Sequence, residues 1–146
     1  MRSVGRGGQR SAVDLEPTGV WFCHPAGMSM DPVVTNPEHY KVLFENDRVR
    51  VLEYTDQPGD VTTPHQHPNS VMYTMSSFRR RLVSGDVGRE VELAAGAANW
   101  LPAQIHHGEN IGDTTTHAIF VELKGAGAEL GGPAEAGPGE LGPRSS

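Results

Sequence analysis

The chain has little cysteine and no long apolar run. Cys23 is the single cysteine among 146 residues, which rules out an intrachain disulfide and with it the disulfide scaffold of small secreted domains. The apolar segment GVWFC near the N-terminus falls well below the roughly 18 residues that a membrane span requires. It is also too short for the apolar region of a signal peptide. We therefore expect a soluble, cytoplasmic protein without a membrane partner.

Basic residues are scarce as well. The chain has 12 Lys and Arg against 18 Asp and Glu, a formal net charge of −6. This balance argues against a nucleic-acid partner, because phosphate contacts require clustered cations. Arg79, Arg80 and Arg81 form the one basic cluster, but alternation along a strand would turn Arg80 to the opposite face from its neighbours. We expect a solvated face from Arg79 and Arg81, with Arg80 directed inward or into an interface.

Both ends of the chain lack the pattern of a packed domain. Residues 125–146 contain ten Gly or Pro among 22 residues and no aromatic residue. The apolar surface that this segment could bury is too small to offset the entropy cost of ordering it. We therefore predict a disordered tail. Residues 1–37 have little periodicity, and Met28 and Met30 offer alternative starts. This segment is either a flexible leader or, over residues 1–27, a wrongly assigned start.

Residues 38–124 differ, because strand-forming segments there alternate with turn signals. Residues 48–55 show the clearest alternation, with Val49 and Val51 on one face and Leu52 and Tyr54 on the other. No helical period competes with this pattern, so we predict an all-β sandwich or barrel. Strands are expected within residues 40–46, 48–55, 70–78, 79–84, 85–93, 95–102 and 116–124. The aromatic residues at strand positions, expected in the core, are Tyr73, Phe78, Trp100 and Phe120.

Two pairs of histidines stand out. His65 and His67 are two positions apart, so both side chains leave the same face if the segment is extended. Imidazole is a suitable ligand for Zn, Fe, Cu and Ni. His106 and His107 follow about 40 residues later and are adjacent, so one of them can join the first pair while the other faces solvent or supporting groups.

The first pair lies in a segment that resembles the first motif of small single-domain cupins, of the RmlC-like cupin superfamily. In that motif a glycine is followed after five residues by H-x-H, which Gly59, His65 and His67 match. A glutamate should follow at position 71 or 72, where this chain has Val71 and Met72. The anionic ligand of the motif is therefore missing, and Met72 is expected to pack in its place.

The second cupin motif is matched in part. Gly96 and, after five residues, Pro102 agree with it, as does Asn110. Counting from Pro102 selects His107 as the ligand, whereas counting back from Asn110 selects His106. We favour His106, because the sequence HHGEN also fits the H-x-x-E-N pattern of small cupins.

The resemblance implies a cupin-type jelly-roll β-barrel over residues 38–124 that forms a homodimer through its sheets. It implies a divalent transition metal, iron in the first place, with Zn, Mn, Ni or Cu as alternatives. The metal ligands would come from His65, His67, His106 and His107. Glu109 and Tyr54 are the candidate catalytic groups for proton transfer.

Three histidines without a carboxylate resemble the sites of thiol dioxygenases and related cupin oxygenases. Such a site keeps open coordination positions, and its additional positive charge favours small anionic substrates. We therefore predict a metal-dependent enzyme acting on a small polar or anionic molecule. One alternative is a non-catalytic cupin that binds a small ligand as a sensor or storage module, which the missing glutamate favours. The other is a zinc- or manganese-dependent isomerase or lyase.

Overall fold

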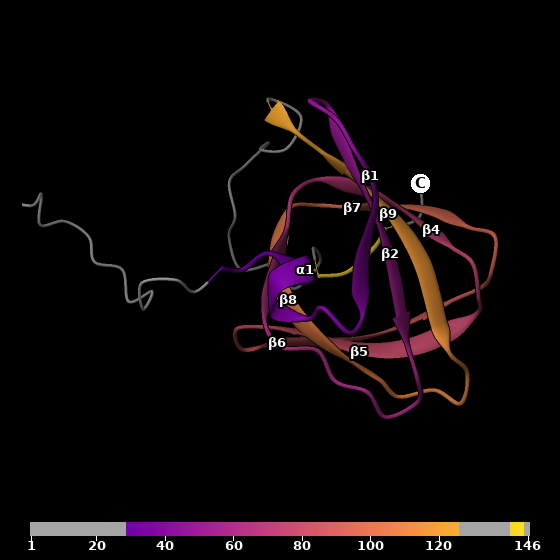
Figure 1. The fold of residues 1–146 in the computed structure, drawn as a ribbon. Helices are drawn as coiled ribbons and strands as arrows, with labels where there is room; N and C mark the ends of the chain where they lie inside the picture. Colours follow the sequence, from indigo (N-terminus) through magenta and orange to yellow (C-terminus); the bar gives the residue numbers. More distant parts are fainter. Residues whose placement is uncertain (1–28, 126–140, 145–146) are drawn as a thin grey trace, which may run out of the picture.

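The computed structural model describes residues 29–125 and 141–144, which form a β-barrel with one short helix (Figure 1). No helix in these residues is long and apolar enough to cross a membrane. The elements in chain order are α1 (Pro32–Thr35), β1 (Tyr40–Glu45), β2 (Val49–Asp56), β3 (His65–His67), β4 (Ser70–Thr74), β5 (Phe78–Ser84), β6 (Val87–Leu93), β7 (Ala98–Leu101), β8 (Gln104–Asn110) and β9 (Thr116–Leu123).

The strands form two antiparallel sheets. The five-stranded sheet has the order β1-β2-β9-β4-β7, and the four-stranded sheet has the order β3-β8-β5-β6. Strands that are neighbours in space are often distant in sequence, as in the eight-residue pairing of β2 with β9. These connections give a jelly-roll barrel, which confirms the predicted fold class.

Alternation along the strands decides which side chains enter the barrel. In β5, Phe78 and Leu82 are buried and Arg80 is only 7% exposed. Arg79 and Arg81 leave the opposite face, where each guanidinium lies 3.2 Å from Glu90. The predicted division of this basic cluster is therefore confirmed.

The main core lies between the two sheets, and Met72, Phe78 and Phe120 belong to it as expected. Tyr73 and Trp100 do not, because they occupy the outward positions next to Met72 and Leu101. They are 44% and 40% exposed on the outer face of the five-stranded sheet, so their predicted core placement is wrong. The members of the core are Tyr40, Leu52, Tyr54, Met72, Phe78, Leu101, Ala118 and Phe120.

The packed structure begins before residue 38, where the domain was expected to start. Asp31 caps α1 by accepting a hydrogen bond from the Val33 amide, and its carboxylate lies 2.7 Å from the Arg50 guanidinium. Asn36 is completely buried and connects the helix to the segment before β3. Residues 1–28 of the expected leader lie outside the described residues.

A short piece of the C-terminal segment also packs on the barrel. Leu141 is fully buried against Leu82 and Val91, because it supplies an apolar side chain to that end of the four-stranded sheet. Arg144 pairs with Trp100 through two backbone hydrogen bonds of 2.7 and 2.8 Å. Residues 126–140 and 145–146 of the predicted disordered tail lie outside the described residues.

Candidate metal centre

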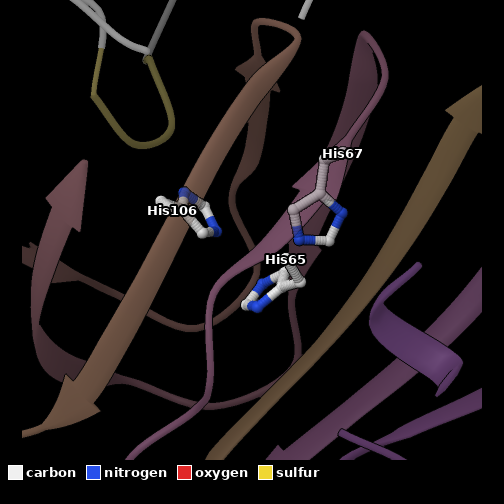
Figure 2. A group of neighbouring side chains, drawn as sticks. All are labelled: His65, His67 and His106. Atoms are coloured by element: carbon white, nitrogen blue, oxygen red, sulfur yellow. The ribbon is translucent and has the colours of Figure 1, made fainter. Parts of the chain in front are cut away.

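Strands β3 and β8 bring three histidines together inside the barrel. His65 lies directly opposite His106 in the register of these strands, and His67 is on the same face as His65. One potential ligand atom from each of the three lies within 4.8 Å of the others. The ring centroids are 4.9 to 5.3 Å apart, and Figure 2 shows the rings turned toward a common space.

Each of these histidines is held from behind through Nδ1. The Nδ1 of His65 donates to the Thr63 carbonyl at 2.7 Å. The Nδ1 of His67 donates to the Glu122 carboxylate at 2.8 Å. The Thr63 carbonyl is closer to His65 Nδ1 than the Asn36 side-chain nitrogen, which lies at 3.3 Å. The proton is therefore on Nδ1 in both rings, and the lone pair of each neutral ring is on Nε2.

His106 follows the same rule through Gln104. Its Nδ1 lies 2.7 Å from Gln104 Oε1, an oxygen that also accepts the Gly142 amide at 2.9 Å. The amide nitrogen of Gln104 donates to the Pro102 carbonyl, which fixes the orientation of the side-chain amide. All three imidazoles therefore present Nε2 lone pairs, the form in which histidine binds a metal.

Burial keeps His65 and His106 in this neutral form. Burial first, and then the neighbouring His67, lower the pKa of His65 to about 3. The same two causes hold the pKa of His106 well below its usual value. Protons therefore do not compete with a metal for Nε2 of His65 and His106 near neutral pH.

The carboxylate behind His67 belongs to a buried ion network. Glu122 is 2% exposed, and its second oxygen accepts hydrogen bonds from Arg50 at 2.8 to 2.9 Å. Arg50 in turn reaches Asp31 at the start of α1. A carboxylate that orients a ligating histidine and raises its basicity is a common support of metal sites.

The other predicted site residues take different positions. His107 and Glu109 occupy the outward positions of β8, and Glu109 lies 3.9 Å from Arg81 on that outer face. Neither joins the three histidines. Tyr54 is inside the barrel, but its hydroxyl donates to Asp56.

The fold shows what replaces the glutamate of the cupin motif. Met72 is buried in the core at that position and Val71 faces outward. The nearby acid is instead Glu122, which is paired in register with Ser70 on the neighbouring strand. It contacts Nδ1 of a histidine and not the face where the lone pairs meet.

Sequence reasoning missed three supporting residues. Glu122 is an acid at an inward position of an apolar strand, which signals a buried partner. Gln104 precedes His106 by two positions and so shares its face. The hydroxyl of Tyr40 lies 3.1 Å from Nε2 of His65 and 3.2 Å from Nε2 of His67. No motif or spacing around Tyr40 in the sequence indicated this position. Burial raises the pKa of the Tyr40 hydroxyl.

A small cavity adjoins the histidines. Its volume is about 40 Å³, which corresponds to a few water molecules. His65, His106 and Arg80 supply its polar wall, and Pro143 lines it from the C-terminal segment. Arg80 forms an ion pair with Asp56, and its guanidinium carbon lies 5.0 Å from the centre of the Tyr54 ring.

No protein-family model matches the sequence, and no curated protein matches it. Solved structures do match. A cupin domain from Bordetella pertussis Tohama I aligns with a TM-score of 0.56 at 26% identity, covering 59% of this chain and 92% of that one.

Two further solved structures are similar over the same region. A conserved protein with a double-stranded β-helix domain from Klebsiella pneumoniae has a TM-score of 0.48 at 21% identity, covering 60% of this chain and 77% of its own. A polyketide cyclase from Streptomyces resistomycificus has a TM-score of 0.46 at 24% identity, covering 57% of this chain and 63% of its own. The match to the solved cupin domain agrees with the resemblance found in the sequence.

Proposed function

Because the domain is a cupin whose three buried histidines converge, we propose that the protein is a metal-dependent enzyme acting on a small polar or anionic molecule. One observation supports this above all. Each Nδ1 of His65, His67 and His106 is bound to an acceptor behind it, so three Nε2 lone pairs face one another. The Tyr40 hydroxyl can donate to one of these nitrogens at a time, whereas a cation would satisfy all three.

The donor set fits a first-row transition metal. His65, His67 and His106 would hold it through neutral imidazoles, a set that suits Fe, Zn, Cu and Ni. When bound, such an ion would supply Lewis-acid chemistry and, in the case of iron, redox chemistry with dioxygen. Three protein ligands leave coordination positions open for a small molecule.

The residues around the three histidines favour redox chemistry over proton transfer as the reaction type to test first. Among the described residues, two carboxylates are buried in the barrel, Asp56 and Glu122. Both are held by arginines, Arg80 and Arg50. An isomerase or lyase needs a carboxylate or similar base free to move a proton. We therefore place an iron dioxygenase ahead of a zinc or manganese isomerase or lyase.

The second candidate is a non-catalytic cupin that binds a small ligand. The absence of the motif glutamate, where the chain has Val71 and Met72, favours it. A cytoplasmic location belongs to the proposal in both cases.

The test is elemental analysis of untagged protein beside His65→Ala/His67→Ala. We expect near-stoichiometric metal in the wild type and its loss in the double variant. His107→Ala is the matched control, since it removes a histidine of the same strand from the outward face, and it should retain the metal. Iron would lead to oxygen-uptake assays with thiols and organic acids. Absence of metal, even after reconstitution, would sink the enzyme proposal and leave the ligand-binding cupin.

A further inference from the structure

Tyr40 makes contacts that the three-histidine description does not explain. Its hydroxyl oxygen is 3.1 Å from Nε2 of His65 and 3.2 Å from Nε2 of His67. Both nitrogens carry lone pairs, because their rings donate through Nδ1. A phenol has one proton and satisfies one of these nitrogens at a time. In the second contact, a lone pair of the Tyr40 oxygen therefore faces the lone pair of the other histidine nitrogen, and the two repel.

A cation shared by the three atoms removes this conflict, and the distances fit one. Two ligands at about 2.0–2.1 Å from one ion are about 2.9 Å apart at a right angle and about 3.4 Å apart in a tetrahedron. The two separations between the Tyr40 oxygen and the histidine nitrogens, 3.1 and 3.2 Å, fall between these limits. The oxygen is thus placed as a neighbouring ligand would be.

The fold fixes Tyr40 in this position. Its ring packs 4.6 Å from the Tyr54 ring and 6.0 Å from the Phe120 ring, measured between centroids. The buried Asn36 accepts the Tyr40 amide at its carbonyl and the Thr63 amide at its side-chain oxygen. One residue therefore ties the start of β1 to the segment that orients His65.

We propose that Tyr40 Oη is a fourth protein ligand of the metal centre. This inference rests on the proposed metal centre and adds a residue to it. The phenolate supplies the anionic ligand that the cupin motif lacks at Val71 and Met72. The set of three imidazoles and one phenolate carries one negative charge. It therefore binds an oxidised ion such as Fe(III) or Cu(II) more tightly than three imidazoles alone would.

The test is electronic absorption of protein loaded with Fe(III) or Cu(II), beside Tyr40→Phe. We expect a visible phenolate-to-metal charge-transfer band in the wild type and none in the variant. Metal affinity should fall by more than the about 10- to 100-fold that loss of a supporting residue costs. Tyr54→Phe is the matched control, since it removes the hydroxyl of the adjacent buried tyrosine, which is bound to Asp56. It should retain both the band and the affinity.

The outcomes separate this inference from the proposed function. Metal-loaded wild type without the band, or Tyr40→Phe with unchanged affinity, overturns the role of Tyr40 and leaves the three-histidine centre standing. A wild type that binds no metal overturns the centre itself and the role of Tyr40 with it. If Tyr40→Phe fails to fold, resonance Raman on the wild type decides the matter, because phenolate vibrations are enhanced only when the oxygen is bound to the metal.

Discussion

Glu122 supports the centre from behind His67. One carboxylate oxygen accepts from His67 Nδ1 at 2.8 Å, and the other pairs with Arg50. The same side chain thereby selects the tautomer of a candidate ligand and anchors α1 through Arg50 and Asp31. We therefore expect substitution of this buried carboxylate to affect both metal binding and the stability of the fold.

We expect Glu122→Gln to weaken metal binding by about 10- to 100-fold. The amide oxygen can still accept from His67, but the amide nitrogen then faces the Arg50 guanidinium, and two donors repel. We expect a loss of about 1–3 kcal/mol in unfolding free energy from the unmatched buried groups. Chelator competition measures the affinity, and chemical denaturation measures the stability.

Glu109→Gln is the control for this change, because Glu109 lies on the outer face of β8 beside Arg81. It should alter neither quantity. Unchanged metal affinity in Glu122→Gln would show that the negative charge of this carboxylate contributes nothing to metal binding.

At the scale of elements, residues 141–144 pack on the barrel through one isolated β-bridge and one buried leucine. Arg144 bridges to Trp100 at the edge of β7, and Leu141 fills the space against Leu82 and Val91. Gly142 has φ of +85°, a backbone conformation that favours glycine. A Cβ there would lie 2.8 Å from Leu82 Cδ1.

Gly142→Ala should therefore undock this segment while the barrel stays folded. We expect the amides of Trp100 and Arg144 to lose protection from hydrogen exchange, because each donates to the other's carbonyl. Amides of the β2 and β9 pairing should keep theirs. Gly88→Ala is the control, since a Cβ at Gly88 meets no atom closer than 3.9 Å. Full protection of Trp100 in Gly142→Ala would show that the segment accommodates the side chain.

The alternation of residues along the strands predicted which side chains share a face, but not which strands meet in the folded barrel. Alternation placed Leu52 and Tyr54 on one face of their strand and turned Arg80 away from Arg79 and Arg81, and the H-x-H spacing placed His65 and His67 on one face. It gave no hint of Tyr40, because β1 meets the histidines through pairings between segments far apart in the chain. The inward and outward faces of β4 and β7 were also ambiguous, since aromatic residues such as Tyr73 and Trp100 suit either face.

On the scale of the whole molecule, the outer face of the five-stranded sheet carries an apolar row of side chains from edge to edge. In the register of the strands, one row of side chains crosses it: Phe44, Val51, Val121, Val71 and Trp100. Ile119 and Tyr73 lie in the next row.

The charges of this face lie in the neighbouring rows. Glu53 is opposite Lys41 in the register of the strands and pairs with His117 at 3.1 Å. An apolar row of this kind can pack against another sheet about 10 Å away. A second copy offers such a sheet through a two-fold axis.

We accordingly expect a homodimer with twice the 15.7 kDa mass of the chain and monomers from Val71→Lys. A lysine in the middle of the apolar row would bring two buried charges together across the axis. Val61→Lys is the control, because Val61 is 57% exposed and lies outside the sheets. Light scattering at equal protein concentrations measures the mass. A monomeric wild type would remove the sheet face as the dimer interface.

The oxygen of Gln104 that orients His106 also accepts the amide of Gly142. Metal binding at the proposed centre and docking of residues 141–144 would thus act on one shared atom, and thermodynamic linkage would make their influence mutual. We therefore expect that anything that releases residues 141–144 changes the metal affinity of the centre. By reciprocity and to the same degree, the ion changes how firmly those residues stay in place.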